Sequence, residues 1–215
     1  MVTSSIEAVL FDFGGVFTGS PFQAIDKYAA AQGVDRDDLM LLVFGSYHAD
    51  TDHPWHQCER GELGLVEAFT QITASATDAG IRFDAGELFS GMADDPYDRT
   101  IVVDYVRSVR ARGIRTAVVT NNVAEYGSTW RTMIPIDELF DAVIDSCEIG
   151  VRKPNPAIYH TALEQLGVTD PSRAVFLDDF EGNVIAAREL GLHGIVVGYD
   201  PQPALDELTV LLEAS

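Results

Sequence analysis

Short apolar runs that alternate with helical patterns are the feature that most constrains the fold of this chain. The runs are rich in β-branched and aliphatic residues, as buried parallel strands are, and lie at 8–11, 116–120, 142–144, 174–177 and 194–198. Helical stripes within 102–109 and 158–166 separate some of them, and a glycine follows each stripe where helices commonly end. This alternation predicts an α/β fold, a Rossmann-like doubly wound parallel sheet with helices on both faces.

The segment 18–95 departs from the alternation because it contains no convincing strand. It has helical stripes instead, at Phe22, Ile25 and Ala29 and at Leu63, Val66, Phe69 and Ile72. A structureless loop of this length is improbable, so we expect a small α-helical cap domain, residues 18–95, inserted after the first strand. Residues 1–17 and 96–215 then form the core domain, with hinges near 18–21 and 94–96. Such a cap lies over the carboxyl ends of the strands, where open α/β sheets bind ligands.

Polar residues stand at the carboxyl ends of four predicted strands. Each has an ordinary structural explanation as a turn former, a helix cap or an exposed side chain. In a parallel sheet these ends converge on one edge, and four coincidences there favour a shared pocket. The residues are Asp12 after the first strand, Thr120 and Asn121 at the second, Lys153 beyond the third, and Asp178 and Asp179 at the fourth.

The chemistry open to this set is phosphoryl transfer. A carboxylate such as Asp12 can act as a nucleophile and form an aspartyl-phosphate. Asp12 and Asp179, with a backbone carbonyl, offer the hard oxygens that Mg²⁺ prefers. Lys153 supplies a fixed positive charge, while Thr120 and the amide of Asn121 can donate hydrogen bonds to phosphate oxygens.

In this order the residues resemble the motifs of the haloacid dehalogenase-like hydrolases. Asp12 corresponds to motif one, Thr120 to motif two, Lys153 to motif three and Asp178-Asp179 to motif four, and the helical insertion resembles the family's cap. Three stretches resemble the branch that contains the N-terminal phosphatase domain of soluble epoxide hydrolase and bacterial sugar-phosphate phosphatases. They are Gly-Val-Arg-Lys-Pro-Asn-Pro at 150–156, Phe-Leu-Asp-Asp-Phe-Glu-Gly-Asn at 176–183 and Glu-Arg-Gly-Glu at 59–62.

The resemblance implies a Mg²⁺-dependent phosphatase of a small phosphorylated metabolite, with a sugar phosphate as one candidate. Asp12 is then the nucleophile, Lys153 steadies it, and Thr120 and Asn121 hold the phosphate. The implied metal ligands are Asp12, the carbonyl of Gly14, Asp178 and Asp179, with Asn183 organising the metal loop.

Gly14 is a departure from the family pattern. Phosphatases of the family usually carry a second aspartate there, which protonates the leaving group, and general acid–base help is worth about 10²–10⁴-fold. Three interpretations stay open: a leaving group that needs little protonation, another proton donor such as a cap histidine, or weak or absent activity. The alternatives to a phosphatase are a metal-free 2-haloacid dehalogenase that uses Asp12 as nucleophile, and a non-catalytic binding or regulatory protein.

The cap segment holds a cluster of histidines and aspartates: His48, Asp50, Asp52, His53, Trp55 and His56. Its spacing matches no strong metal-binding pattern, and packing or surface roles are the ordinary explanation. The alternative is substrate recognition by Trp55 and His56, with Trp55 as an apolar or sugar-stacking wall.

Composition limits the partners. Acidic residues outnumber basic ones 34 to 14, a net charge of −20, which disfavours nucleic acid and anionic membranes as partners. A small anionic substrate then needs a local cation. No signal peptide or membrane-spanning run is visible, so we expect a cytoplasmic protein, monomeric or homodimeric. Cys58 and Cys147 match no metal or redox spacing.

Overall fold

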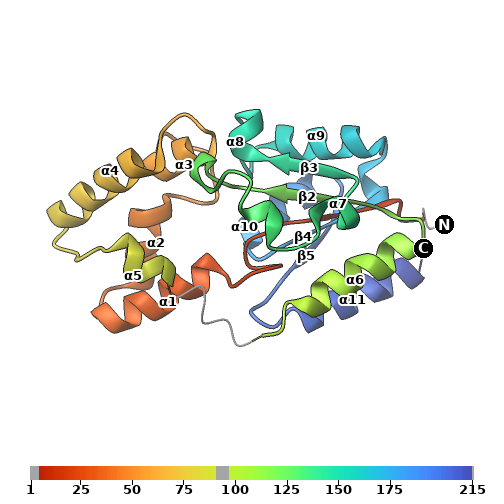
Figure 1. Ribbon diagram of the computed structural model, residues 1–215, viewed down its shortest axis with the longest axis horizontal. Coiled ribbons are helices and arrows are strands. Elements are labelled where there is room, and N and C mark those ends of the chain that lie inside the picture. The colour runs from red at the N-terminus through yellow and green to blue at the C-terminus, as the bar shows by residue number, and fades with distance from the viewer. Residues whose placement is uncertain (1–4, 91–96, 215) are drawn as a thin grey trace.

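A five-stranded parallel sheet organises the computed structural model, which describes residues 5–90 and 97–214 (Figure 1). The strand order is β3-β2-β1-β4-β5, so the first strand lies in the middle. The strands are β1 (Ala8–Phe11), β2 (Arg115–Thr120), β3 (Ala142–Asp145), β4 (Ala174–Asp178) and β5 (His193–Val196). Each predicted run is a strand. The last begins one residue earlier than predicted and ends two residues earlier, because its pairing with β4 covers only 193–196.

Helices cover both faces of the sheet, as the sequence predicts. On one face α6 (Thr100–Ala111) and α11 (Gln202–Glu213) pack through Val106 and Leu208 against Val9 and Phe11. On the other face α9 (Pro156–Leu166) and α10 (Glu181–Glu189) contribute residues to a cluster with Leu10 of β1. Short helices and 3₁₀ turns complete the connections: α7 (Ile136–Leu139), α8 (Ser146–Ile149), η2 (Ala124–Tyr126), η3 (Trp130–Thr132) and η4 (Pro171–Arg173).

The insertion after β1 is helical. Its helices are α1 (Pro21–Gln32), α2 (Arg36–Phe44), α3 (Pro54–Glu59), α4 (Leu65–Asp78) and α5 (Ala85–Ser90). They share a hydrophobic cluster that also takes in Val123 and, at its edge, Phe180 from the sheet side. The helices therefore build a core of their own that rests on the loops beyond the strands. The proposed boundaries at 18 and 95 stay a prediction, and the hinge at 94–96 lies outside the described residues.

The stripe predicted for the second half of the insertion is partly wrong. Val66 is 81% exposed, and the buried residues of α4 are Ala68, Ile72 and Ala76. These follow the four-residue spacing of one helix face, and Val66 lies off that face. Nowhere in 5–90 or 97–214 is a helix long and apolar enough to cross a membrane.

The β1 turn brings backbone against the end of β4. Gly15 has a φ of +71°, and a Cβ built on it would lie 1.9 Å from Oδ2 of Asp179. Phe17 closes the turn by donating its amide to the carbonyl of Phe13 at 2.9 Å. A side chain at position 15 would therefore be disfavoured by the left-handed backbone conformation and would also clash with the Asp179 carboxylate.

Gly15→Ala should cost more stability than Gly33→Ala. Gly33 has a φ of +68° with nothing within 4 Å, so its alanine variant carries only the left-handed backbone penalty. That penalty is about 1–2 kcal/mol. Urea unfolding of both variants measures the difference, and equal free energies of unfolding would show that Asp179 does not lie against Gly15.

Candidate active site

A buried ammonium group stands between two carboxylates at the carboxyl edge of the sheet. Lys153 Nζ lies 2.6 Å from Oδ1 of Asp12 and 2.7 Å from Oδ2 of Asp178. All three side chains are buried. Asp12 follows β1 directly, and its amide donates to the carbonyl of Leu177 at 2.8 Å, which ties it to β4. Neighbouring parallel strands thus present both carboxylates to one lysine.

Asn121 fixes the backbone of Lys153. Its Oδ1 accepts from the Lys153 amide at 2.7 Å, and its Nδ2 donates to the Lys153 carbonyl at 3.1 Å. The hydroxyl of Thr120 is buried at the end of β2 and donates to the adjacent Asn121 carbonyl at 3.4 Å. The Asn121 side chain therefore fixes the lysine backbone, and the Thr120 hydroxyl makes a long contact with its own neighbour.

The two consecutive aspartates have different surroundings. Asp178 accepts from the Phe180 amide at 2.8 Å and from Nδ2 of Asn183 at 3.1 Å, besides Lys153. Asp179 accepts from the hydroxyl of Ser20 at 2.5 Å. Donors thus occupy both oxygens of Asp178, whereas Asp179 retains acceptor capacity for a cation.

Asp12, Asp178 and Asp179 form a group of metal-binding size. Each offers one oxygen, and these oxygens lie within 4.8 Å of one another; in the described part of the chain no other such group was found. Burial raises the pKa of Asp12 to about 7, with Lys153 opposing and Asp178 adding to the shift. Burial, followed by the charges of Asp178 and Asp12, holds the pKa of Asp179 well above its usual value.

The donor set fits a hard divalent cation. Three carboxylates face one ammonium group, and burial together with the neighbouring carboxylates raises the pKa of Asp12 and of Asp179. Carboxylate oxygens suit Mg²⁺, which usually keeps several waters and binds through one or two carboxylates together with a phosphate. Asp12, Asp178 and Asp179 can each offer one oxygen to such an ion, and Asp178 also binds Lys153.

Gly14 lies beside this group without steric constraint. A Cβ built on it would meet only Pro21 Cδ at 4.0 Å, and its φ is not in the left-handed region. The fold therefore has room for a side chain where this sequence has none.

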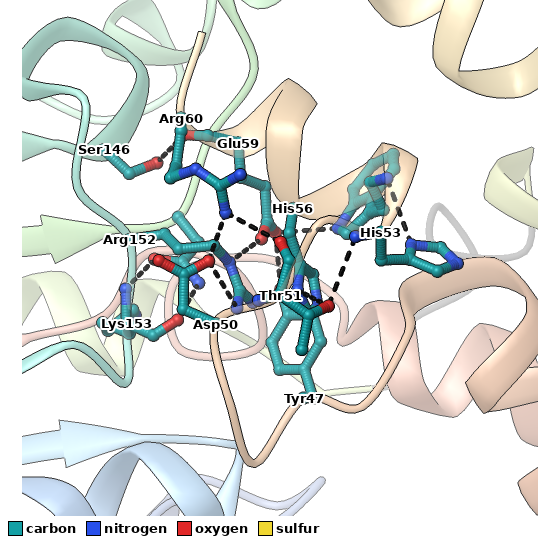
Figure 2. A network of polar contacts seen from close by, with 12 residues as sticks. Tyr47, Asp50, Thr51, His53, His56, Glu59, Arg60, Ser146, Arg152 and Lys153 are labelled. Atoms are coloured by element: carbon teal, nitrogen blue, oxygen red, sulfur yellow. Dashed lines mark hydrogen bonds and ion pairs between the residues drawn. The ribbon is translucent and has the colours of Figure 1, made fainter. Parts of the chain in front are cut away.

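Trp55 and His56 are buried among the cap helices, and Figure 2 shows His56 with its hydrogen-bond partner Thr51. The Trp55 ring is stacked with Phe89 at 5.8 Å between centroids, and its Nε1 donates to Oε1 of Glu59 at 2.8 Å. His56 is fully buried, and its Nδ1 accepts from the Thr51 amide at 3.0 Å. Burial lowers the pKa of His56 to about 3, so it is neutral.

The other two histidines of the predicted cluster differ from each other. His53 caps α3, because its Nδ1 accepts from the Trp55 amide at 3.2 Å. His48 is exposed, and its ring packs on Phe180 at 5.1 Å between centroids. Phe180 directly follows Asp179, so His48 is the histidine that borders the carboxylate loop.

Sequence reasoning missed the polar links between the cap helices and the sheet. Ser20 caps α1 by accepting from the Phe22 amide at 3.2 Å while its hydroxyl binds Asp179. Glu59 binds Arg152 through an ion pair of 2.6 Å (Figure 2). The signal for Ser20 was its position before Pro21, a helix-start signature. Glu59 and Arg152 lie in stretches that the resemblance singled out without assigning them a role.

Sequence comparisons agree with this geometry. Residues 6–191 match the sequence model of the haloacid dehalogenase-like hydrolases, and the chain belongs to that family. It is 30% identical to mouse acyl-CoA dehydrogenase family member 10 and 34% identical to rat bifunctional epoxide hydrolase 2, over 97% and 95% of this chain. It spans only 19% and 38% of those two proteins. It is also 26% identical to a phosphoglycolate phosphatase of Colwellia psychrerythraea, covering 90% of this chain and 86% of the relative.

Solved structures share the fold. A haloacid dehalogenase-family enzyme from Bacteroides thetaiotaomicron, in complex with magnesium and inorganic phosphate, superposes with a TM-score of 0.60 at 20% identity. The match covers 91% of this chain and 96% of that one. The L-2-haloacid dehalogenase from Xanthobacter autotrophicus, with chloropropionic acid covalently bound, gives a TM-score of 0.56 at 21% identity over 95% and 82%.

Stabilisation by Mg²⁺ should increase with pH. Asp12, whose pKa is raised to about 7, carries a proton below that pH, and a cation must displace it; above it the carboxylate is free. The rise in melting temperature caused by Mg²⁺ is therefore expected to be larger near about pH 8 than near about pH 6.

Thermal unfolding of Asp12→Asn and of Asp78→Asn, an exposed aspartate at the end of α4, provides the comparison. Asp12→Asn should flatten the pH dependence and Asp78→Asn should keep it. A Mg²⁺ effect of the same size at both pH values in the unsubstituted protein would contradict the assignment.

Proposed function

We propose that this chain is a Mg²⁺-dependent phosphatase of a small phosphorylated metabolite. The observation that carries the proposal is the buried Lys153 ammonium between Asp12 and Asp178, beside a third carboxylate. One lysine among three carboxylates, of which Asp12 and Asp178 are buried and Asp179 is half-buried, leaves a negative site that becomes suitable for a phosphate only with a divalent cation.

Asp12 is the proposed nucleophile. Its carboxylate attacks the phosphorus and the bond from phosphorus to the leaving oxygen breaks, which yields an aspartyl-phosphate that water then hydrolyses. Lys153 keeps Asp12 oriented through its 2.6 Å contact and offers charge to a phosphate oxygen. The Thr120 hydroxyl and the backbone amide of Asn121 donate to the other phosphate oxygens. A bound Mg²⁺, held by Asp12, Asp179 and the Gly14 carbonyl, would screen the charge between the nucleophile and the phosphate.

The acidic loop favours this activity over a dehalogenase. A metal-free attack on a haloacid has no use for a further carboxylate such as Asp179, which stands beside the charges of Asp178 and Asp12. The similarity to a phosphoglycolate phosphatase and to an enzyme that binds magnesium and phosphate supports the same choice. A sugar phosphate as the substrate, a cytoplasmic location and a monomeric or homodimeric state remain predictions.

Trp55 and His56 have a different proposed role from the one expected. Both are buried, Trp55 among aromatic rings and His56 in a hydrogen bond to the Thr51 amide. We therefore propose that they stabilise the cap helices and do not contact substrate.

The decisive assay compares phosphate release and halide release. Wild type should release phosphate from a panel of phosphomonoesters only with Mg²⁺, and Asp12→Asn should reduce the rate by about 10³-fold or more. Asp78→Asn is the matched control and should retain the full rate. Metal-free halide release from 2-haloacids would favour the dehalogenase, and absence of both activities would favour a binding protein.

His48 is the proposed proton donor to the leaving group. Its ring is exposed beside Phe180, and it has no hydrogen bond or ion pair with any described residue. His53 caps a helix and His56 is buried and neutral, so neither can take this role. The space beside Gly14 allows the family's usual acid to be introduced for comparison.

His48→Gln should slow poor leaving groups selectively. Hydrolysis of an alkyl phosphate should fall by up to about 10²–10⁴-fold, whereas acetyl phosphate, whose leaving group needs no proton, should be hardly affected. Adding Gly14→Asp should restore the alkyl phosphate rate. Equal effects of His48→Gln on both substrates would remove His48 as the donor.

A further inference from the structure

A buried ion pair joins the cap helices to the residue before Lys153. Glu59, at the end of α3, is 1% exposed, and Arg152 is fully buried. Arg152 Nε donates to Oε2 of Glu59 at 2.6 Å (Figure 2). Removing one partner of such a pair leaves an uncompensated charge in the interior, so the two residues depend on each other.

Glu59 is saturated with donors. Its Oε1 accepts from the Tyr47 hydroxyl at 2.5 Å and from Nε1 of Trp55 at 2.8 Å. Its backbone carbonyl accepts from the hydroxyl of Ser146, at the start of α8, at 2.6 Å. The residue is therefore bound to the sheet side through both its side chain and its backbone.

Arg152 is held in turn by the cap loop between α2 and α3. Its guanidinium lies 4.7 Å from the centroid of the Tyr47 ring, and its Nη1 donates to the Ala49 carbonyl at 3.4 Å. Nη2 is buried without a partner among the described residues.

The pair continues directly into the candidate active site. Arg152 is joined by one peptide bond to Lys153, whose amide and carbonyl bind Asn121 and whose ammonium binds Asp12. The geometry points to Glu59 as a positioning residue, which clamps the cap helices to Arg152 and so holds the Lys153 ammonium between Asp12 and Asp178.

Glu59→Gln tests whether the ion pair between Glu59 and Arg152 holds the Lys153 segment in place. Glutamine has nearly the same shape but only one acceptor oxygen, so it cannot serve Arg152, Tyr47 and Trp55 together. Hydrogen–deuterium exchange should increase both in the cap loop, residues 45–53, and at residues 150–155. Glu62→Gln removes an exposed cap carboxylate that pairs with Arg60, and it should leave both segments unchanged.

The kinetic measurements on Glu59→Gln rest on the proposed phosphatase activity. Glu59→Gln should lower kcat by about tenfold or more while KM changes by less than about threefold, because a misplaced lysine weakens the transition state more than substrate binding. Tyr47→Phe keeps the ring and removes one donor to Glu59, so it should give a smaller decrease in kcat, and it replaces Glu59→Gln if that variant does not fold.

Two results would overturn the inference. Exchange that stays unchanged at 150–155 would show that Glu59 does not hold the lysine segment, and a kcat equal to that of wild type despite increased exchange would show that holding it does not matter. If wild type turns over no phosphomonoester, the proposed function fails, and the exchange experiment still decides whether the clamp exists.

Discussion

The contact on which the rest of the structure depends is the one between the Lys153 ammonium and the carboxylates of Asp12 and Asp178. A buried charge is costly unless it is paired and hydrogen-bonded, so all three groups must reach the same point. The sheet achieves this because β1 and β4 are neighbours and end at the same level. Asn121, from the end of β2, then fixes the lysine backbone. One ion-pair network thus joins segments that are far apart in the sequence.

The site has an excess of negative charge, as the whole chain does. The chain carries a net charge of −20, and the site itself holds one ammonium group among three carboxylates, of which Asp12 and Asp178 are buried. Burial raises the pKa of Asp12 and Asp179, and the charges of the neighbouring carboxylates add to the shift. Gly15 allows the backbone of the first turn to approach Asp179 closely. The negative charge, the close backbone and the lysine together suit a site for a metal ion and a phosphate.

The cap helices are where prediction from sequence was weakest. The helical character of the insertion follows from the spacing of its apolar residues, and it is observed. The faces of individual helices do not follow from this spacing. Val66 fits a stripe and is exposed, while Trp55 and His56, for which both packing and substrate recognition were open, are buried. Burial of a side chain depends on which neighbours cover it, and those neighbours, such as Phe89 for Trp55, are distant in sequence. The Glu59–Arg152 pair was hidden for the same reason.

The sequence by itself determined the class of fold and the residues that gather at one edge. The strand runs predicted a parallel sheet, and because strand ends converge in a parallel sheet, Asp12, Lys153 and Asp178 were expected to share one pocket. Only the tertiary structure decided what each carboxylate does, because that depends on which donors reach it. Asp178 is taken by Lys153 and Asn183, whereas Asp179 faces Ser20 and keeps room for a cation. The tertiary structure also decided which cap histidine borders the site, since long-range packing placed His48 on Phe180 and buried His56.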